Sequence, residues 1–274
     1  MKNITKLILF IIITISFSSC EDVVDVAVNS SQPKLVIDAS IQWQKGTIGN
    51  QQMIKLSKTS DYFNSEIPTV SNAIVYITNS TGTIFNFNEI TPNGQYICTD
   101  FIPAINENYT LTVISEGTTY TSTETLLATP TIDSIEQKMV AGFGGDEIQI
   151  KFFYQDNGSE NNYYLIKFKN NQIPFPEFSA VRDEFFQGNQ MFGFYSNSDL
   201  KKDDVLDMSL QGINERYQNY MNKLIAISGS NGGNPFATPP ATLKGNIVNQ
   251  TNSKNYPLGY FNLSEIDTRT YTVQ

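Results

Sequence analysis

The side chains that could do chemistry in this sequence are carboxylates, hydroxyls and lysines, because the chain contains no histidine. Catalysis by Ser-His-Asp or Cys-His groups, histidine-rich zinc sites and haem attachment are therefore excluded. The 27 Asp and Glu residues could still supply the two acids that a glycosidase places across its sugar. No spacing selects such a pair, so we expect a protein that is not an enzyme and has no catalytic residues.

The densest group of acids does not predict a metal site. Four aspartates lie between residues 199 and 207, but two lysines separate them, and the spacing is not that of a calcium-binding loop with its central glycine. We interpret this stretch as a solvated turn. The glycine-rich stretches 142–145 and 228–233 lack the following helix or the spacing of a phosphate or nucleophile loop. We expect neither a metal nor another cofactor.

Cys20 carries the most specific chemistry of the sequence. Two lysines precede an apolar run, residues 7–15, that is too short to span a bilayer, and a serine-rich stretch leads to the cysteine. This arrangement resembles a bacterial lipoprotein signal peptide. It implies that residues 1–19 are removed, and that Cys20 receives a diacylglycerol on its sulfur and an acyl chain such as palmitate on its amine. The alternative is a plain secretory signal that contains a cysteine by chance.

The remaining composition is that of an acidic, folded, exported protein. Removal of residues 1–19 leaves 274 − 19 = 255 residues, and the hydrophobic content of 40% supports a core. The formal net charge is −9 and the basic residues are scattered, so nucleic acid is not an expected partner. Once Cys20 is lipidated, Cys98 is the only other cysteine, so no intrachain disulfide is expected.

Hydrophobic residues recur mainly with a period of two, which predicts half-buried strands. The runs, separated by turn signals such as Asn93-Gly94 and Glu116-Gly117, are 35–43, 73–78, 84–88, 95–99, 109–113, 118–123, 148–154, 162–169, 191–196, 204–210, 257–263 and 268–273. Tyr109 begins its run in a way that resembles a tyrosine corner, the alternative being an ordinary aromatic inside a strand. Tyr96 lacks that signature, and we expect it to contribute less stability.

The pattern predicts an all-β protein of two sandwich-like halves, of immunoglobulin or transthyretin type, with one short amphipathic helix in the second. The helix is expected near 211–227, where apolar residues recur at helical spacing and are interpreted as core against the second sheet. Thr129-Pro130 marks the domain boundary. We expect a lipidated tether over 20–32, an N-terminal β-sandwich over 33–129 and a C-terminal β-rich domain over 130–274.

Three features could contact a partner or carry a modification. Ten Tyr and Phe residues lie between 163 and 195, most of them expected in the core and some on the surface. The loop 234–240 combines Phe236 with the rigid Pro239 and Pro240, which suits a preorganised contact as well as a simple connector. Asp133-Ser134-Ile135 resembles the Asp-Ser/Thr-aliphatic acceptor of periplasmic O-glycosylation in Bacteroidetes, which makes Ser134 a candidate glycan site.

Several longer segments together resemble one family. They are "EDVVDV", "PKLVIDASI", "IKLSKTSDYF", "VSNAIVYI", "YTLTV", "YTSTETLL", "DEFFQGN", "YQNYMNKL", "GNPFATPPATLKGNI" and "LGYF". The sequence is similar to the Bacteroidetes outer-membrane lipoprotein family of domain of unknown function 4249 over nearly the whole mature chain. The resemblance implies an outer-membrane lipoprotein encoded beside TonB-dependent receptors, with a carboxypeptidase-regulatory or transthyretin-type first half. It implies no catalytic residues.

From these observations we expect an outer-membrane lipoprotein, anchored through Cys20, that faces the periplasm or the cell surface. Its expected function is that of a non-catalytic binding or accessory subunit, in partnership with a TonB-dependent receptor of an uptake system. Two alternatives remain open: a carboxylate-dependent surface hydrolase and a structural adhesin. A cleft with two facing acids would favour the hydrolase, whereas an extended aromatic surface without paired acids would favour the binding subunit.

Overall fold

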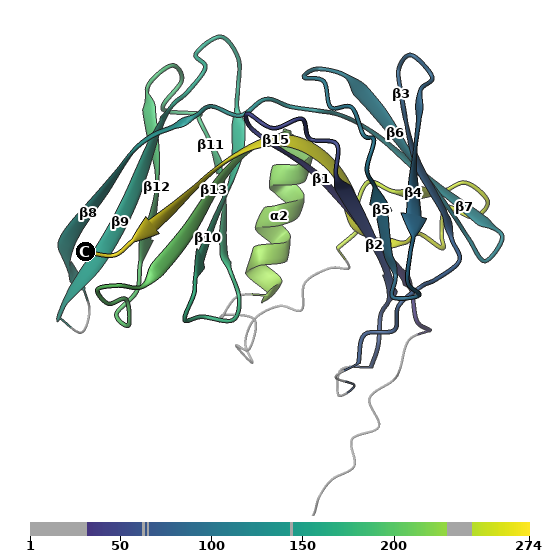
Figure 1. Cartoon of the computed structure of the whole chain (residues 1–274), viewed down its shortest axis with the longest axis horizontal. Helices are drawn as coiled ribbons and strands as arrows, with labels where there is room; N and C mark the ends of the chain where they lie inside the picture. The colour runs from purple at the N-terminus through teal and green to yellow at the C-terminus, as the bar shows by residue number, and fades with distance from the viewer. Residues whose placement is uncertain (1–31, 62–63, 65, 143–144, 229–242) are drawn as a thin grey trace, which may run out of the picture. The chain divides into compact units, whose positions relative to one another are not determined.

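Strands make up most of the chain, so the expected all-β fold class is confirmed (Figure 1). The computed structural model describes residues 32–61, 64, 66–142, 145–228 and 243–274. Its strands are β1 Leu35–Gln44, β2 Gln52–Lys58, β3 Ile74–Asn79, β4 Ile84–Glu89, β5 Gln95–Cys98, β6 Asn108–Ser115, β7 Thr118–Thr125, β8 Ile132–Gly142, β9 Gly145–Gln155, β10 Tyr163–Asn170, β11 Glu177–Arg182, β12 Gln190–Ser196, β13 Val205–Ile213, β14 Val248–Asn249 and β15 Leu258–Thr272. The helix within these described residues is α2, Glu215–Ser228. Within these ranges, no helix has the length and hydropathy needed to cross a bilayer.

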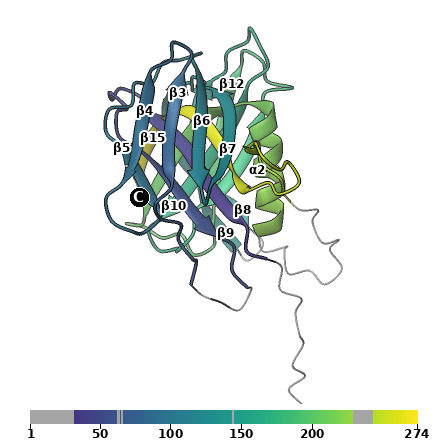
Figure 2. The ribbon, with the colours of Figure 1, turned by 90° about the vertical axis from the view of Figure 1, so that its right-hand side faces the viewer.

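The strands form two sheets within the unit Pro33–Gln274. The larger has twelve strands in the order β11-β10-β13-β15-β1-β2-β5-β4-β3-β6-β7-β14, and the smaller has the order β12-β9-β8. Strand pairs are antiparallel except β1 with β15, which run in parallel from Val36↔Leu258 to Gln44↔Ile266. Figure 2 shows β3, β6 and β7 of the larger sheet side by side.

Two large hydrophobic clusters give the protein two cores. The first is built by β1 to β7 together with Phe261 and Leu263 of β15, and the second joins β8, β9 and β12 to β10 and β13. Val273 belongs to the second cluster, so the C-terminal segment contributes to both. The domain boundary at residues 129–130 stays a prediction; the chain passes from one core to the other between Leu126 and Ile132.

The patterns at 257–263 and 268–273 predicted two strands, and this was wrong, because β15 covers both. The hydrophobic pattern stops between them because buried polar side chains hold the segment that crosses between the cores. The Glu265 carboxylate accepts a hydrogen bond from the Thr129 amide at 3.1 Å, and that of Asp267 accepts one from the Ile132 amide at 2.7 Å. These bonds satisfy buried donors that would otherwise be costly.

The helix begins at Glu215, four residues later than the start expected near residue 211. β13 continues to Ile213, and Asn214 then caps the helix, because its side-chain oxygen accepts a hydrogen bond from the Tyr217 amide at 2.8 Å. The expected core role is confirmed: Tyr217 and Met221 of α2 pack with Leu165, Ile213 and Tyr260. α2 thereby contributes to a third hydrophobic cluster, which also includes residues of β10, β13 and β15.

The tyrosine corner at Tyr109 is confirmed. Its buried hydroxyl donates to the Ile102 carbonyl at 2.8 Å and accepts from the Ala104 amide at 2.9 Å. We expected Tyr96 to contribute less stability than Tyr109 because its sequence lacks the corner signature. That reason was wrong, because the Tyr96 hydroxyl makes an equivalent pair of bonds. It donates to the Val70 carbonyl at 2.9 Å and accepts from the Ala73 amide at 3.0 Å. Burial raises the pKa of both phenols, that of Tyr109 to about 12.

Candidate partner-binding groove

Exposed phenylalanines gather in one part of the described chain. Phe175, Phe178, Phe185, Phe186, Phe192 and Phe194 are each more than a third exposed. In contrast, among the described residues before residue 130, the exposed large apolar ones are six isoleucines and one methionine, with no aromatic among them. Single exposed apolar residues are normal, but a cluster of large ones marks an interaction surface.

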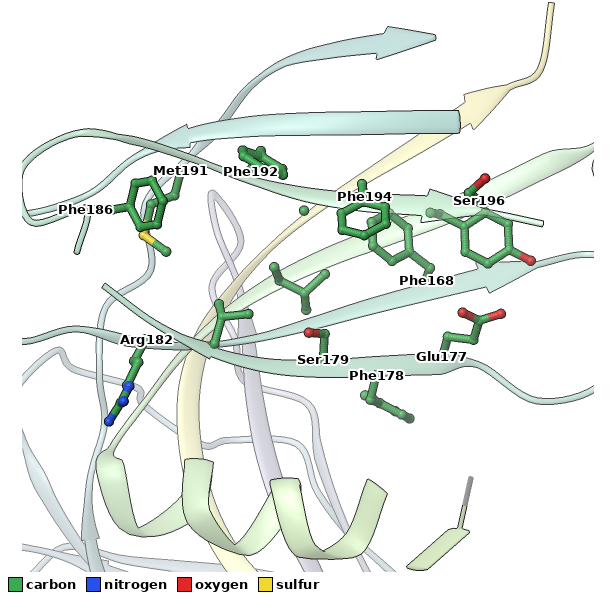
Figure 3. A pocket seen from close by; sticks show the side chains of 14 residues that line it. Phe168, Glu177, Phe178, Ser179, Arg182, Phe186, Met191, Phe192, Phe194 and Ser196 are labelled. Atoms are coloured by element: carbon green, nitrogen blue, oxygen red, sulfur yellow. The ribbon is translucent and has the colours of Figure 1, made fainter. Parts of the chain in front are cut away.

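Four of these phenylalanines surround a groove of about 460 Å³ between β11 and β12. In Figure 3, Phe192 and Phe194 lie along one strand, Glu177 and Ser179 along the other, and Phe168 lies between them. β11 is an edge strand of the larger sheet, and β12 is an edge strand of the smaller one. The groove therefore follows two neighbouring sheet edges.

The floor of the groove is the second hydrophobic core itself. Ile166, Phe168, Met191 and Tyr195 are all at least nine-tenths buried, belong to that core and also line the groove. The rings of Phe168 and Tyr195 lie 5.7 Å apart, within the range of favourable aromatic contacts. The core thus reaches the groove, and an apolar occupant would extend it.

Gly193, in the middle of β12, keeps this edge close to the core. A Cβ atom at this position would lie 2.6 Å from the Phe152 ring and 3.1 Å from the Ile166 side chain. On the other face of β12, the ring of Phe192 is fixed by Phe153, with 6.2 Å between centroids, and by the Lys151 ammonium at 4.8 Å. Phe153 and Lys151 of β9 therefore hold the Phe192 ring in place on β12.

Two buried carboxylates fix the connector 183–189, which carries Phe186. Asp183 accepts a hydrogen bond from the Asn162 amide at 2.8 Å. Asp156 accepts one from the Gly188 amide at 2.9 Å and another from the Tyr164 hydroxyl at 2.7 Å. Both acids are nearly inaccessible, and neither lines the groove. They hold the connector in place, which lowers the conformational entropy that a partner has to overcome.

Polar side chains in the groove are few, and the charged ones, Glu177 and Arg182, lie at the two ends of β11. Partial burial raises the pKa of the Glu177 carboxyl. Arg182 forms an ion pair with Glu184, and the Ser196 hydroxyl donates to Glu147 at 3.1 Å. An apolar, aromatic cavity with a few polar groups can bind and orient an apolar partner. Among the residues that line the groove, Glu177 is the one carboxylate.

Most site residues expected from the sequence lie elsewhere. Cys20, Phe236, Pro239 and Pro240 lie outside the described residues, and their roles stay predictions. Ser134 is exposed on β8, beside an irregularity in the pairing with β9 between Ile132 and Ser134. The structure thus places the predicted glycan acceptor at the surface and far along the chain from the groove.

Of the four aspartates between 199 and 207, Asp199 and Asp203 lie in turns, as expected, whereas Asp204 is buried and Asp207 lies in β13. Asp204 accepts a hydrogen bond from the Lys201 amide at 3.0 Å, and Asp207 accepts one from the Thr270 hydroxyl at 2.6 Å. Across the described residues, no group of three or more potential metal ligands is found. Cys98 is buried, and burial raises the pKa of its thiol to about 11.

The aromatic-rich stretch 163–195 contains most of the groove, but the sequence did not show which of its rings are exposed. Phe168 and Tyr195 are core, whereas Phe178, Phe186, Phe192 and Phe194 are exposed around the groove. Sequence reasoning missed β11 and with it Glu177. The available signal was the pair Pro174 and Pro176, just before residue 177. A residue that precedes a proline favours extended backbone, and within sheets prolines occur on edge strands or at strand starts.

The chain belongs to the family described as "Domain of unknown function (DUF4249)", whose model matches residues 21–270. No curated protein matches the chain. It is similar to a solved two-domain fibronectin type III segment of chicken tenascin, at 10% identity and a TM-score of 0.22, over 66% of this chain and 90% of that one. A cytokine receptor complex matches at 7% identity and a TM-score of 0.25, over 65% of this chain and 83% of that chain. A DUF4785 family protein of Legionella pneumophila matches at 12% identity and a TM-score of 0.25, over 65% of this chain and 51% of that chain.

Proposed function

We propose that this DUF4249 protein is a non-catalytic binding subunit, anchored by lipid at Cys20 to the outer membrane, that serves a TonB-dependent receptor of an uptake system. The observation that carries the proposal is the aromatic groove between β11 and β12. Its exposed phenylalanines supply the large apolar contact area that the centre of a protein interface requires.

The chemistry of the groove favours binding over hydrolysis. Glycoside hydrolysis by two carboxylates requires both acids to face the same bond. Glu177 is the one acid that lines the groove. The buried Asp156 and Asp183 are engaged in hydrogen bonds with the amides of Gly188 and Asn162. The alternatives, a surface hydrolase and an adhesin, gain no comparable observation from the described residues.

The anchor explains how the groove would meet its partner. Lipidation at Cys20 would confine the protein to the membrane that also holds the receptor, and residues 20–32 would serve as a tether. Confinement raises the effective concentration of each protein for the other, so a groove of modest area is sufficient.

A pull-down of the native, lipidated protein from detergent-solubilised outer membranes tests the proposal. A TonB-dependent receptor should co-purify with the native protein. Phe186→Ser should lower its recovery at least about tenfold, because Phe186 lines the groove. Phe185→Ser is the matched control, since this neighbouring ring is 84% exposed and does not line the groove. If no receptor co-purifies with the native protein, the proposal fails.

Lipidation and glycosylation have their own tests. Cys20→Ala should leave the protein unacylated and outside the membrane fraction, and unchanged membrane recovery without acyl chains would contradict the anchor. We propose Ser134 as an O-glycan acceptor because it is exposed and lies beside an irregular strand pairing. The intact mass should then exceed that of Ser134→Ala by a glycan, and masses that differ by one oxygen would remove the proposal.

A further inference from the structure

The four edges of the two sheets differ in how they resist pairing with another strand. β14 is only two residues long, β8 carries charged residues and an irregular register, and β11 follows two prolines and has a charged residue at each end. Short length, charges, bulges and prolines are the devices by which proteins protect their sheet edges. Three of the four edges are therefore protected.

β12 has none of these devices. Its sequence, QMFGFYS, contains no charged residue and no proline, and all seven residues pair with β9 without a register shift. Phe192 and Phe194 are exposed on one face of the strand. As the edge strand of an antiparallel pair, β12 directs every second set of backbone N–H and C=O groups away from β9. These groups are available to a further strand.

We propose that β12 receives an extended segment of a partner protein as a fourth strand of the sheet β12-β9-β8. The inference rests on the proposed function and names the way the partner is bound. Main-chain hydrogen bonds to β12 would hold the segment, and alternate side chains would select it. On one face they would enter the groove beside Met191 and Ile166, and on the other they would pack against Phe192 and Phe194. Because the floor of the groove is hydrophobic core, the alternate positions of the segment that enter the groove are apolar.

The groove favours a single segment over a second copy of this chain. β11 lies across the groove from β12, and the connector 183–189 joins the two strands at one end, where Phe186 lies beside Met191, so the space beside β12 is bounded on two sides. A two-fold related copy that paired through its own β12 would bring its own β11 and connector into the same space. An isolated extended segment adds one strand without that conflict.

Synthetic peptides test the inference on the lipidated full-length protein in detergent. The probe is a fluorescent pool of peptides of about nine residues with Val, Ile or Phe at every second position. The control pool has the same composition with the apolar residues grouped together. We expect the alternating pool to bind in fluorescence anisotropy and the grouped pool not to bind. Phe194→Ser should weaken binding at least about tenfold, whereas Phe175→Ser, at an exposed ring outside the groove, should not.

Backbone N-methylation of the best peptide separates strand addition from simple apolar contact. Methylation at alternate residues removes the N–H donors of one strand edge and leaves the side chains unchanged. One of the two alternate series should lose binding at least about tenfold, and the other should retain it. Equal affinity of both series, or no binding by any pool, would overturn the inference.

Sedimentation and the pull-down distinguish the remaining outcomes. A dimer that depends on Phe194 would assign the edge to a second copy and overturn the inference. If the receptor co-purifies through Phe186 while the N-methyl series bind alike, the proposed function stands and strand addition falls. If the alternating peptides bind with the expected N-methyl pattern and no receptor co-purifies, strand addition stands and the receptor assignment falls.

Discussion

β8 and β12 are the two edges of one three-stranded sheet, and they have opposite character. β8 carries Asp133, Glu136 and Lys138, and its pairing with β9 is irregular near its start. Glu136 and Lys138 form an ion pair at 2.8 Å. β12 has seven uncharged residues in regular register with β9 and exposes two phenylalanines.

The difference shows that the open edge is not a general property of this sheet. Both strands pair with β9 and contribute to the same hydrophobic core. An exposed ion pair adds little stability, so the charges of β8 are better explained as protection of the edge. This contrast between β8 and β12 supports our proposal that β12 pairs with a segment of a partner.

The largest expected effect comes from giving β12 the kind of protection that β8 has. Phe192→Lys should reduce recovery of the receptor at least about thirtyfold, because it removes an aromatic contact and places a charge on the open edge. Met139→Lys makes a comparable change on β8, where Met139 is 61% exposed, and should leave recovery unchanged. Equal losses in the two variants would show that the edges do not differ in function.

Next in size is the effect of crowding β12 against the core. Gly193→Ala should lower the free energy of unfolding by about 1–3 kcal/mol, because the new methyl group meets the Phe152 ring. The gain from a less flexible unfolded chain, about 0.4–1 kcal/mol, is smaller. Urea denaturation measures the difference. Phe152→Leu in the same chain should recover part of the loss, and strictly additive effects would contradict this contact.

Tyr96 and Tyr109 belong to the first core and do not line the groove, so their substitution should change stability and leave binding unchanged. Tyr109→Phe and Tyr96→Phe should each cost about 1–2 kcal/mol in thermal or urea unfolding, because each leaves a buried amide and a carbonyl without a partner. Recovery of the receptor should not change at temperatures where the variants are folded. A near-zero cost for Tyr109→Phe with a full cost for Tyr96→Phe would contradict the importance of the corner.

The pH dependence of Tyr109 gives an independent check. Its folded pKa is raised from 10.0 to about 12. The folded state therefore keeps this proton more tightly than the unfolded state, and the associated stability is present below pH 10.0 and lost as pH rises toward 12. The loss between these values should be smaller in Tyr109→Phe than in the native protein.

The smallest expected effect concerns Glu177. Its folded pKa is raised above the ordinary 4.5 by burial, so the associated stability is present below that value and lost as pH rises through the raised pKa. Glu177→Gln should remove this part of the pH dependence, as measured by urea denaturation at several pH values. Peptide binding should also strengthen in the native protein as pH falls, because Glu177, the one carboxylate that lines the groove, loses its charge. A pH profile unchanged by the substitution would contradict the burial of this carboxyl.

Much of the fold could be predicted because most strands have one buried and one solvent-exposed face. β6 and β7 are joined at Glu116 and Gly117, both with positive φ, which is the turn that the sequence signals there. β15 was read as two strands because its buried middle is polar, at Glu265 and Asp267. Local patterns do not reveal that a polar residue has a partner far along the chain.

The groove was less predictable than the fold for a related reason. Phe168 and Phe194 are the same residue type in similar runs, yet one lies in the core and the other on the surface. In β12 the buried Met191 and Tyr195 alternate with exposed residues such as Phe194, so the difference depends on which face of the strand meets the core, and that is set by long-range pairing. Composition showed where aromatic residues are dense, and only the sheet topology showed which of them face solvent.

Site-specific photo-crosslinking in native outer membranes tests the central claim most directly. A photoreactive phenylalanine analogue at position 194 of β12 should form a covalent adduct with a TonB-dependent receptor. The same analogue at position 139 of β8 should form none. A receptor adduct from position 139 alone, or no adduct from position 194, would contradict the account that β12 is the open, partner-binding edge.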